Sequence, residues 1–223
     1  MGGGLKTTPL YGIIMNIPFL IKCSECQKES YIFISLDDRQ LSALCECGND
    51  ISGFLDNSFT TGVKLLFRSK YEYLEKKDYS LSIVFSAAAL EGEISQLFFK
   101  WKDIENIRKP IRISDEELEE TLRNYKTIDR KIENVAKLMY PGGIVEFVNS
   151  NKDLHNMIQD GFSSISVSNI SNDIRKELFW KRNRILHLAD VKYKEEEAKK
   201  CFNIARLGLK VFEELDNYKR NTI

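Results

Sequence analysis

The pattern of hydrophobic and polar positions changes near residue 60. Before it, short apolar runs such as residues 31–35 are bounded by polar and turn-forming residues, which is typical of strands. After it, apolar residues recur every three or four positions over long segments, as on one face of a helix. The pattern predicts a mainly α protein, with a small β-rich domain at 1–60 and an all-α domain at 61–223.

The second domain is predicted to contain a series of helices. We expect them at 61–77, 80–101, 114–125, 129–140 and 194–217, with short helices and a Ser-rich loop between 143 and 170. Ser171 or Asn172 is expected to cap another helix that ends near His187. The helix at 80–101 is apolar nearly all round, which places it at the centre of the bundle.

Several details of these helices follow from local spacing. Ser114 and Glu117 form a capping-box pattern, and residues 102–113, which include Pro110, read as a connection. The first helix is expected to bury one side, made of Val63, Leu66, Phe67 and Tyr71. The last helix is expected to bury a stripe made of Ala198, Cys201, Ala205, Gly208, Phe212 and Leu215.

Charge adds a local signal to this picture. The chain has 33 Lys and Arg against 33 Asp and Glu, so overall charge does not predict nucleic-acid binding. The run 175–184 nevertheless holds five cations and only one acid, Glu177. Any affinity for phosphate must therefore be local, and it should weaken as salt is added.

Nothing in the sequence predicts a membrane protein. The apolar stretch 11–21 is too short to span a bilayer and is interrupted by Asn16 and Pro18. It also lacks the basic start and cleavage site of a signal peptide. We therefore expect a cytoplasmic protein.

Four of the five cysteines form two close pairs, Cys23 with Cys26 and Cys45 with Cys47. Two such pairs separated by a strand-like segment favour a four-thiolate zinc ribbon, although the second pair is one residue tighter than a regular knuckle. Gly48 supplies the backbone freedom that a knuckle turn needs. Structural zinc is the favoured reading, and disulfides or free thiols are the alternatives.

The most specific candidates for catalytic residues lie near the end of a basic helix. Arg182 is followed by Asn183 and, after four intervening residues, by His187, one of only two histidines. Arginine binds phosphate through paired charged hydrogen bonds, and histidine exchanges protons near neutral pH. Five residues of α-helix turn through about 500°, so the two side chains would converge only across a helix break near Leu186 or between two copies of the chain. A solvated helix end capped by His187 is the simpler reading.

Together these features resemble the HEPN domain superfamily, over residues 62–223. The resemblance rests on the helix order, on an arginine and a histidine separated by four residues with a polar residue after the arginine, and on an earlier helix that reads 87–91 as Ala-Ala-Ala-Leu-Glu. HEPN proteins are all-α bundles that pair with two such motifs facing each other. Many resemble metal-independent endoribonucleases of toxin–antitoxin and phage-defence systems.

The resemblance implies a role for each motif residue. A ribose 2′-hydroxyl would attack the adjacent phosphate and leave a 2′,3′-cyclic phosphate, with His187 moving protons or positioning the reacting groups and Arg182 neutralising charge. Asn183 would orient one of them, and Glu91 would hold Arg182 or His187. Residues expected to follow the RNA backbone are Lys181, Arg184 and Arg175. No catalytic metal is expected, and the partners would be RNA, a second copy, and an antitoxin or defence-system protein.

Two other functions are compatible with the sequence. A non-catalytic HEPN module would bind RNA, nucleotide or protein, with the ribbon as an adaptor. A zinc-ribbon regulator would bind duplex DNA and use its helical half only to dimerise. The intact motif of Arg182, Asn183 and His187 favours the nuclease, since a module without catalysis has no chemical need for all three.

Overall fold

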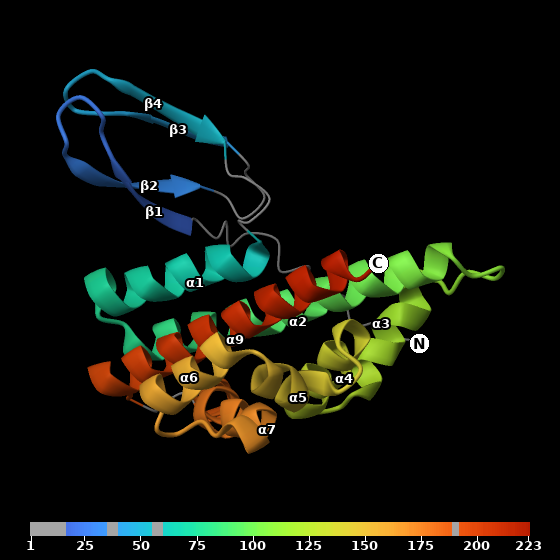
Figure 1. The fold of residues 1–223 in the computed structure, drawn as a ribbon. Coiled ribbons are helices and arrows are strands. Elements are labelled where there is room, and N and C mark those ends of the chain that lie inside the picture. Colours follow the sequence, from blue (N-terminus) through green and yellow to red (C-terminus); the bar gives the residue numbers. More distant parts are fainter. Residues whose placement is uncertain (1–16, 35–39, 55–59, 189–191) are drawn as a thin grey trace, which may run out of the picture. The chain divides into compact units, whose positions relative to one another are not determined.

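The computed structural model divides the chain into two compact units, residues 1–56 and 57–223. It describes residues 17–34, 40–54, 60–188 and 192–223 (Figure 1). Helices dominate the second unit and short strands occupy the first, which confirms the prediction of a mainly α protein with a small β-rich N-terminal region.

The first unit consists of two separate antiparallel hairpins. Strand β1 (Ile17–Lys22) pairs with β2 (Glu29–Ile34), and β3 (Gln40–Leu44) pairs with β4 (Asp50–Phe54). Each hairpin turn contains one cysteine pair. In the second turn Gly48 has φ of 89°, in the left-handed region that glycine adopts without strain.

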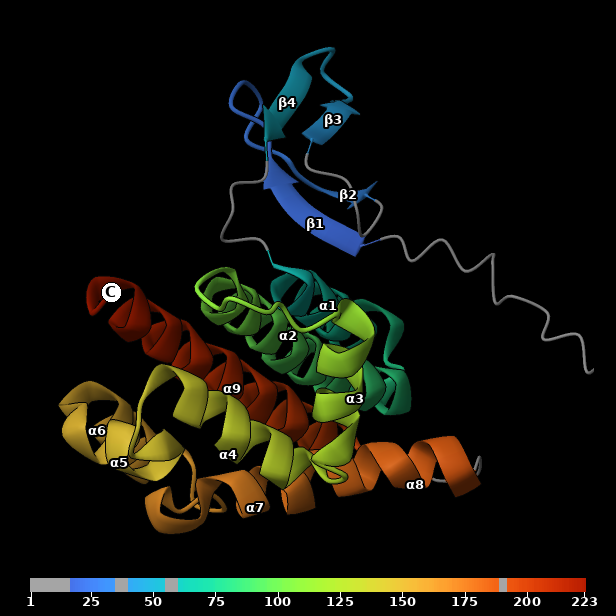
Figure 2. The same ribbon diagram turned by 90° about the vertical axis from the view of Figure 1, so that its right-hand side faces the viewer.

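The second unit is organised around α2 (Tyr79–Ile107), which packs against α1 (Thr61–Tyr71), α9 (Glu195–Asn221) and several shorter helices (Figures 1 and 2). Its position confirms the prediction of a central apolar helix. The remaining helices are α3 (Asp115–Asn124), α4 (Ile128–Met139), α5 (Gly143–Ser150), α6 (Lys152–Gly161), α7 (Ile170–Ile174) and α8 (Trp180–Leu188).

The core forms where α2 and α9 meet. All six residues of the predicted α9 stripe are buried, and fully buried residues of α2 recur at helical spacing: Ile83, Ala87, Leu90, Ile94 and Phe98. Gly208 permits the close approach, because a Cβ there would lie 2.7 Å from Leu90 Cδ1. Helix α3 begins as predicted, with Ser114 and Glu117 forming both bonds of a capping box.

The buried face of α1 differs from the prediction. The buried positions are Gly62, Lys64, Leu65 and Ser69, whereas the predicted stripe is only half-buried. The reason is that α1 packs on α2 through small and polar groups. A Cβ at Gly62 would lie 2.8 Å from the carbonyl oxygen of Ala89, and the Ser69 hydroxyl bonds the Ser86 hydroxyl at 2.7 Å.

Three predicted helix boundaries are also wrong, and one of them is the end of α9, which lies at Asn221 and not at 217. Helix α2 continues to Ile107 through part of the expected connection, where the Asn106 side chain bonds the backbone of Ile113 and closes the turn. The basic helix begins at Ile170, before the predicted caps. It follows the 3₁₀ turn Val167–Asn169 directly, and Asn169 stands at its N-cap position. The helix break expected near Leu186 does not occur before Leu188, where α8 ends, and residues 189–191 lie outside the described residues.

Among the described residues, α2 alone is long and apolar enough to cross a membrane by length and composition. A core helix of a globular protein meets the same criterion, and α2 is packed among the other helices of its unit.

Candidate functional site

The basic motif lies on a helix with an unusual internal turn. Residues 170–188 are helical throughout, but the segment Arg175–Phe179 is π-helical, with one more residue in each hydrogen-bonded ring than an α-helix. Helix α8 follows directly and projects to one side of the bundle in Figure 2. None of its residues is buried, so the motif is presented on an open helix surface.

Arg182 is held by a carboxylate from the central helix. Its Nη2 lies 3.4 Å from Oε2 of Glu91, and both side chains are 31% exposed. The other oxygen of Glu91 is 3.2 Å from Nζ of Lys131 on α4. Glu91 thus bridges two cations from different helices and fixes where the guanidinium of Arg182 lies.

Asn183 contacts the same arginine from the other side. Its Oδ1 accepts a hydrogen bond of 3.0 Å from Nη1 of Arg182. Both terminal nitrogens of Arg182 therefore have partners, and the side chain is oriented by Glu91 and Asn183 together.

His187 does not join this cluster. It is exposed, and α8 continues without interruption to Leu188, so no break near Leu186 turns it toward Arg182. On this continuous helix the two residues point about 140° apart. Within one chain the described part of α8 therefore does not bring Arg182 and His187 to a shared site.

The three residues expected to follow an RNA backbone differ in their surroundings. Lys181 pairs with Glu177 at 3.5 Å, and Arg175 pairs with Asp129 at 3.4 Å, so both charges are partly neutralised. The guanidinium carbon of Arg184 instead lies 4.7 Å from the ring centroid of Trp180. Arg184 is the cation of the three that is presented on an aromatic surface.

Two residues near the motif have structural environments. Burial tends to raise the pKa of Glu177, but its hydrogen bonds and ion pairs with Lys200 and Lys181 outweigh it and lower that pKa. Cys201 is fully buried, as predicted for a small core residue, and burial raises the pKa of its thiol to about 12. The ion pairs of Glu177 and the burial of Cys201 are typical of structural residues.

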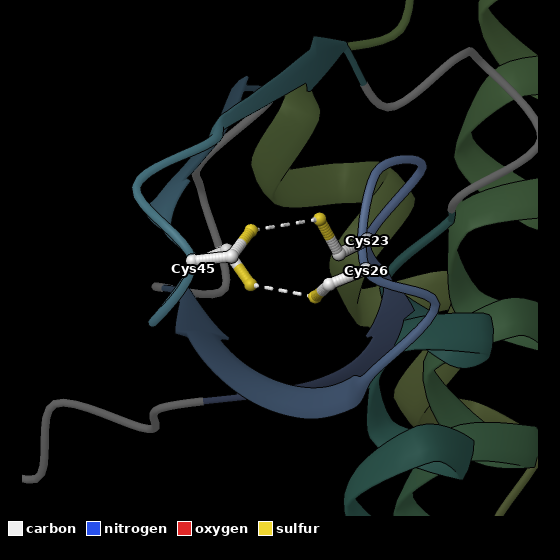
Figure 3. A group of neighbouring side chains, drawn as sticks. Cys23, Cys26 and Cys45 are labelled. Atoms are coloured by element: carbon white, nitrogen blue, oxygen red, sulfur yellow. Dashed lines mark hydrogen bonds between the residues drawn. The ribbon is translucent and has the colours of Figure 1, made fainter.

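The four N-terminal cysteines form a compact cluster. All four Sγ atoms lie within 4.8 Å of one another, with Cys23 3.7 Å from Cys47 and Cys26 3.5 Å from Cys45 (Figure 3). These separations are too long for disulfide bonds. Four thiolates around one zinc ion at about 2.3 Å would be separated by about 3.8 Å, so the cluster can hold a metal ion.

The surroundings of the cluster favour ionised sulfur. The backbone N–H of Cys26, with smaller help from Glu25 and Asn49, lowers the pKa of Cys23 to about 6. The Nδ2 of Asn49 donates a hydrogen bond of 3.6 Å to the Sγ of Cys23. The two turns are also linked by an ion pair of 2.8 Å between Lys28 and Glu46.

Sequence reasoning missed Lys131, the second cation on Glu91. An ion pair between residues forty positions apart leaves no periodic signal, and Lys131 differs from other lysines of α4 only through its position after folding.

No protein-family model, curated protein or solved structure matches this chain.

Proposed function

We propose that the chain is a metal-independent endoribonuclease of the HEPN type that works as a homodimer. The observation that carries the proposal is the arrangement on α8, where Arg182 is oriented by Glu91 and Asn183 on a helix with no buried residue. A guanidinium fixed in this way at an accessible surface suits the recognition of a phosphate.

The reaction would be an intramolecular transesterification of RNA. The 2′-oxygen forms a bond to phosphorus and the bond from phosphorus to the 5′-oxygen breaks, leaving a 2′,3′-cyclic phosphate and a 5′-hydroxyl. Arg182 stabilises the charge that builds on the phosphate oxygens. His187 takes the proton from the 2′-hydroxyl or delivers one to the departing 5′-oxygen. No proton or electron is needed from another reagent.

A homodimer would bring together the arginine and the histidine that one chain keeps apart. Because Arg182 and His187 point apart on one helix, a symmetric pair in which the two α8 helices face each other would bring Arg182 of each chain near His187 of the other. Such pairing also covers the large exposed side chains Leu186 and Leu188. A toxin or phage-defence effector restrained by a partner protein is the biological role that fits this activity.

The N-terminal cluster would hold structural zinc. The support is the close spacing of the Sγ atoms of Cys23, Cys26, Cys45 and Cys47, together with a unit of two short hairpins too small to be stable on hydrophobic burial alone. Zinc would tie the two hairpin turns together. It has no part in the proposed reaction.

The decisive experiment is incubation of the purified protein with labelled single-stranded RNA and a tRNA pool in excess EDTA. Arg182→Ala and His187→Ala are tested beside His155→Ala, which changes the only other histidine. Cleavage to 2′,3′-cyclic phosphate ends by the parent and by His155→Ala, lost in the other two, is the expected result. Cleavage that persists in all variants would reject the assigned residues, and a folded dimer that binds RNA without cutting it would favour the binding module.

A further inference from the structure

Four residues of α8 form one outward stripe that does not include Arg182. Positions i, i+3, i+4 and i+7 of a helix lie on the same face, within an arc of about 100°. In α8 these positions are occupied by Trp180, Asn183, Arg184 and His187. His187 is thus aligned with an aromatic ring and a cation, while Arg182 turns toward α2.

Trp180 is much more exposed to solvent than the other tryptophan of the chain. It is 54% exposed, whereas Trp101, the only other tryptophan in the chain, is 2% exposed in the core. A large aromatic side chain in contact with water loses the stabilisation that burial gives, so an exposed indole beside a candidate site points to a ligand or an interface.

Arg184 gives this surface its chemical character. Its guanidinium lies 4.7 Å from the Trp180 ring centroid, within the range of a cation–π contact. Helix α8 carries Lys181, Arg182 and Arg184 but no carboxylate, and Arg184 has no ion pair with any residue that the structure describes. The charge of Arg184 therefore remains available to an anion.

We propose that Trp180 and Arg184 form a subsite for one unpaired nucleotide of an RNA strand. The base stacks on the exposed part of the indole, and the adjoining phosphate pairs with Arg184. Each nucleotide of an RNA strand carries a flat base and a negatively charged phosphate. The base can stack on an aromatic ring, and the phosphate can pair with a cation beside that ring. This assignment rests on the proposed function and adds a residue that selects single-stranded over paired RNA.

The location of the subsite makes it a positioning element. Trp180 and His187 are seven residues apart on one stripe, which places them about 10 Å apart along the helix axis. A nucleotide held at Trp180 is therefore a neighbour of the one that reacts. Binding it would restrict how the strand lies across His187 without touching the reacting atoms.

The test uses the intrinsic fluorescence of Trp180. The full-length protein is titrated with a short oligoribonucleotide that is fully 2′-O-methylated, so that it cannot be cleaved. Stacking on Trp180 should quench the exposed tryptophan, while buried Trp101 provides an internal reference that does not respond. In Trp180→Ala the binding constant should fall about tenfold, and Trp180→Phe should recover most of it, because alanine removes the stacking surface and phenylalanine retains a ring.

Arg184 is tested through salt dependence. Arg184→Ala should lower the slope of log K against log salt by about 0.7, the value for one phosphate contact on a single strand, and Arg184→Lys should restore it. A duplex of the same sequence should bind no better to the parent than to Trp180→Ala. Circular dichroism and sedimentation of each variant show whether it is folded and whether it still dimerises.

The outcomes separate this subsite from the nuclease proposal. Quenching with loss of affinity in Trp180→Ala, but no cleavage of natural RNA by the parent, would support the subsite and reject the nuclease. Cleavage with unchanged KM in Trp180→Ala would reject the subsite and leave the nuclease standing. If Trp180→Ala converts a dimer to a monomer, the exposed indole is a contact between copies and the subsite is wrong.

Discussion

Glu91 and Arg182 are ninety-one positions apart in the sequence, and their side chains meet at 3.4 Å between the central helix and the projecting helix. Because Glu91 also binds Lys131, one carboxylate connects α2, α4 and α8. The pair is partly exposed and contributes little to stability, as is usual for such ion pairs. Its effect is on where the guanidinium lies.

Glu91→Gln should therefore affect activity much more than stability. Removing the charge leaves Arg182 without its anchoring anion, and we expect RNA cleavage to fall at least about tenfold through loss of positioning. The free energy of unfolding should change by less than about 1 kcal/mol. Initial rates and thermal melts of the purified variant give the two quantities.

Glu105→Gln is the matched control for Glu91. Glu105 is also a partly exposed glutamate of α2 in an ion pair, with Lys102 at 2.8 Å, but it does not contact Arg182. It should melt and cleave like the parent. Equal loss of activity in both variants would assign the effect of Glu91 to α2 as a whole.

Mixing two inactive variants tests the shared site. If Arg182 of one chain acts with His187 of the other, a dimer of Arg182→Ala with His187→Ala has one intact pair. Random exchange of subunits should then restore about a quarter of the parental cleavage. Exchange is started by dilution and remixing, and followed by sedimentation. No recovery from proven mixed dimers would contradict a site made of one arginine and one histidine in trans.

Chelation tests the metal cluster. We expect about one zinc ion per chain by elemental analysis, and its loss in Cys26→Ser but not in Cys201→Ala, which removes a thiol outside the cluster. Removing zinc should leave helical circular dichroism nearly unchanged and speed tryptic cleavage at the exposed Lys22 and Lys28. Full zinc content in Cys26→Ser would show that the cluster is not the binding site.

The buried carboxyl of Glu93 predicts a pH-dependent stability. Burial raises its pKa, and the hydroxyl of Thr60, which donates to it, only partly offsets this effect. Below the ordinary pKa near 4.5 the carboxyl is neutral in both states and carries no penalty. As the pH rises through the higher folded pKa, the folded state must accommodate a charge and loses stability.

Glu93→Gln should consequently raise Tm at about pH 8 and have little effect at about pH 4, because glutamine stays neutral and still accepts from Thr60. Scanning calorimetry across this range measures the difference. Glu120→Gln, at an exposed position of α3, should show no such trend. A pH-independent shift in Glu93→Gln would mean that packing, not ionisation, is responsible.

Gly208→Ala should destabilise the junction of α2 and α9. The new Cβ would lie 2.7 and 2.8 Å from the two terminal carbons of Leu90, which is fully buried and has little room to move. Overpacking of this kind costs about 1–3 kcal/mol. Denaturant unfolding measures the loss, and Gly161→Ala, with no atom within 4 Å of its Cβ, should be nearly neutral.

Local patterns in the sequence predicted much of the fold. The α9 stripe, the capping box at Ser114 and the clustering of four cysteines depend on spacing within one or two segments, and the structure confirms them. The face of α1 was not predictable in this way. Its contact with α2 is made by Gly62, Ser69 and other small or polar groups, which hydrophobic periodicity does not identify.

The residues of the candidate site are a prediction from the sequence, and their geometry was not predictable from it. The types and spacing of Arg182, Asn183 and His187 indicated phosphate chemistry, and the turn per residue indicated that they diverge on one helix. Whether the helix breaks, and which carboxylate and lysine surround Arg182, depend on packing between segments far apart in the chain. The roles of these residues remain predictions.

The π-helical segment Arg175–Phe179 sets the direction in which the side chains of α8 point about the helix axis. It lies between the part of the helix anchored by buried Ile170 and Ile174 and the part that carries the motif. If the same residues formed regular α-helix instead, each would turn the chain further than it does in the wider π-helix, and everything after the segment would be rotated about the helix axis. Arg182 would then lose Glu91 although no side chain of the motif had changed. In this region the geometry of the backbone, as much as the identity of the side chains, determines which groups meet.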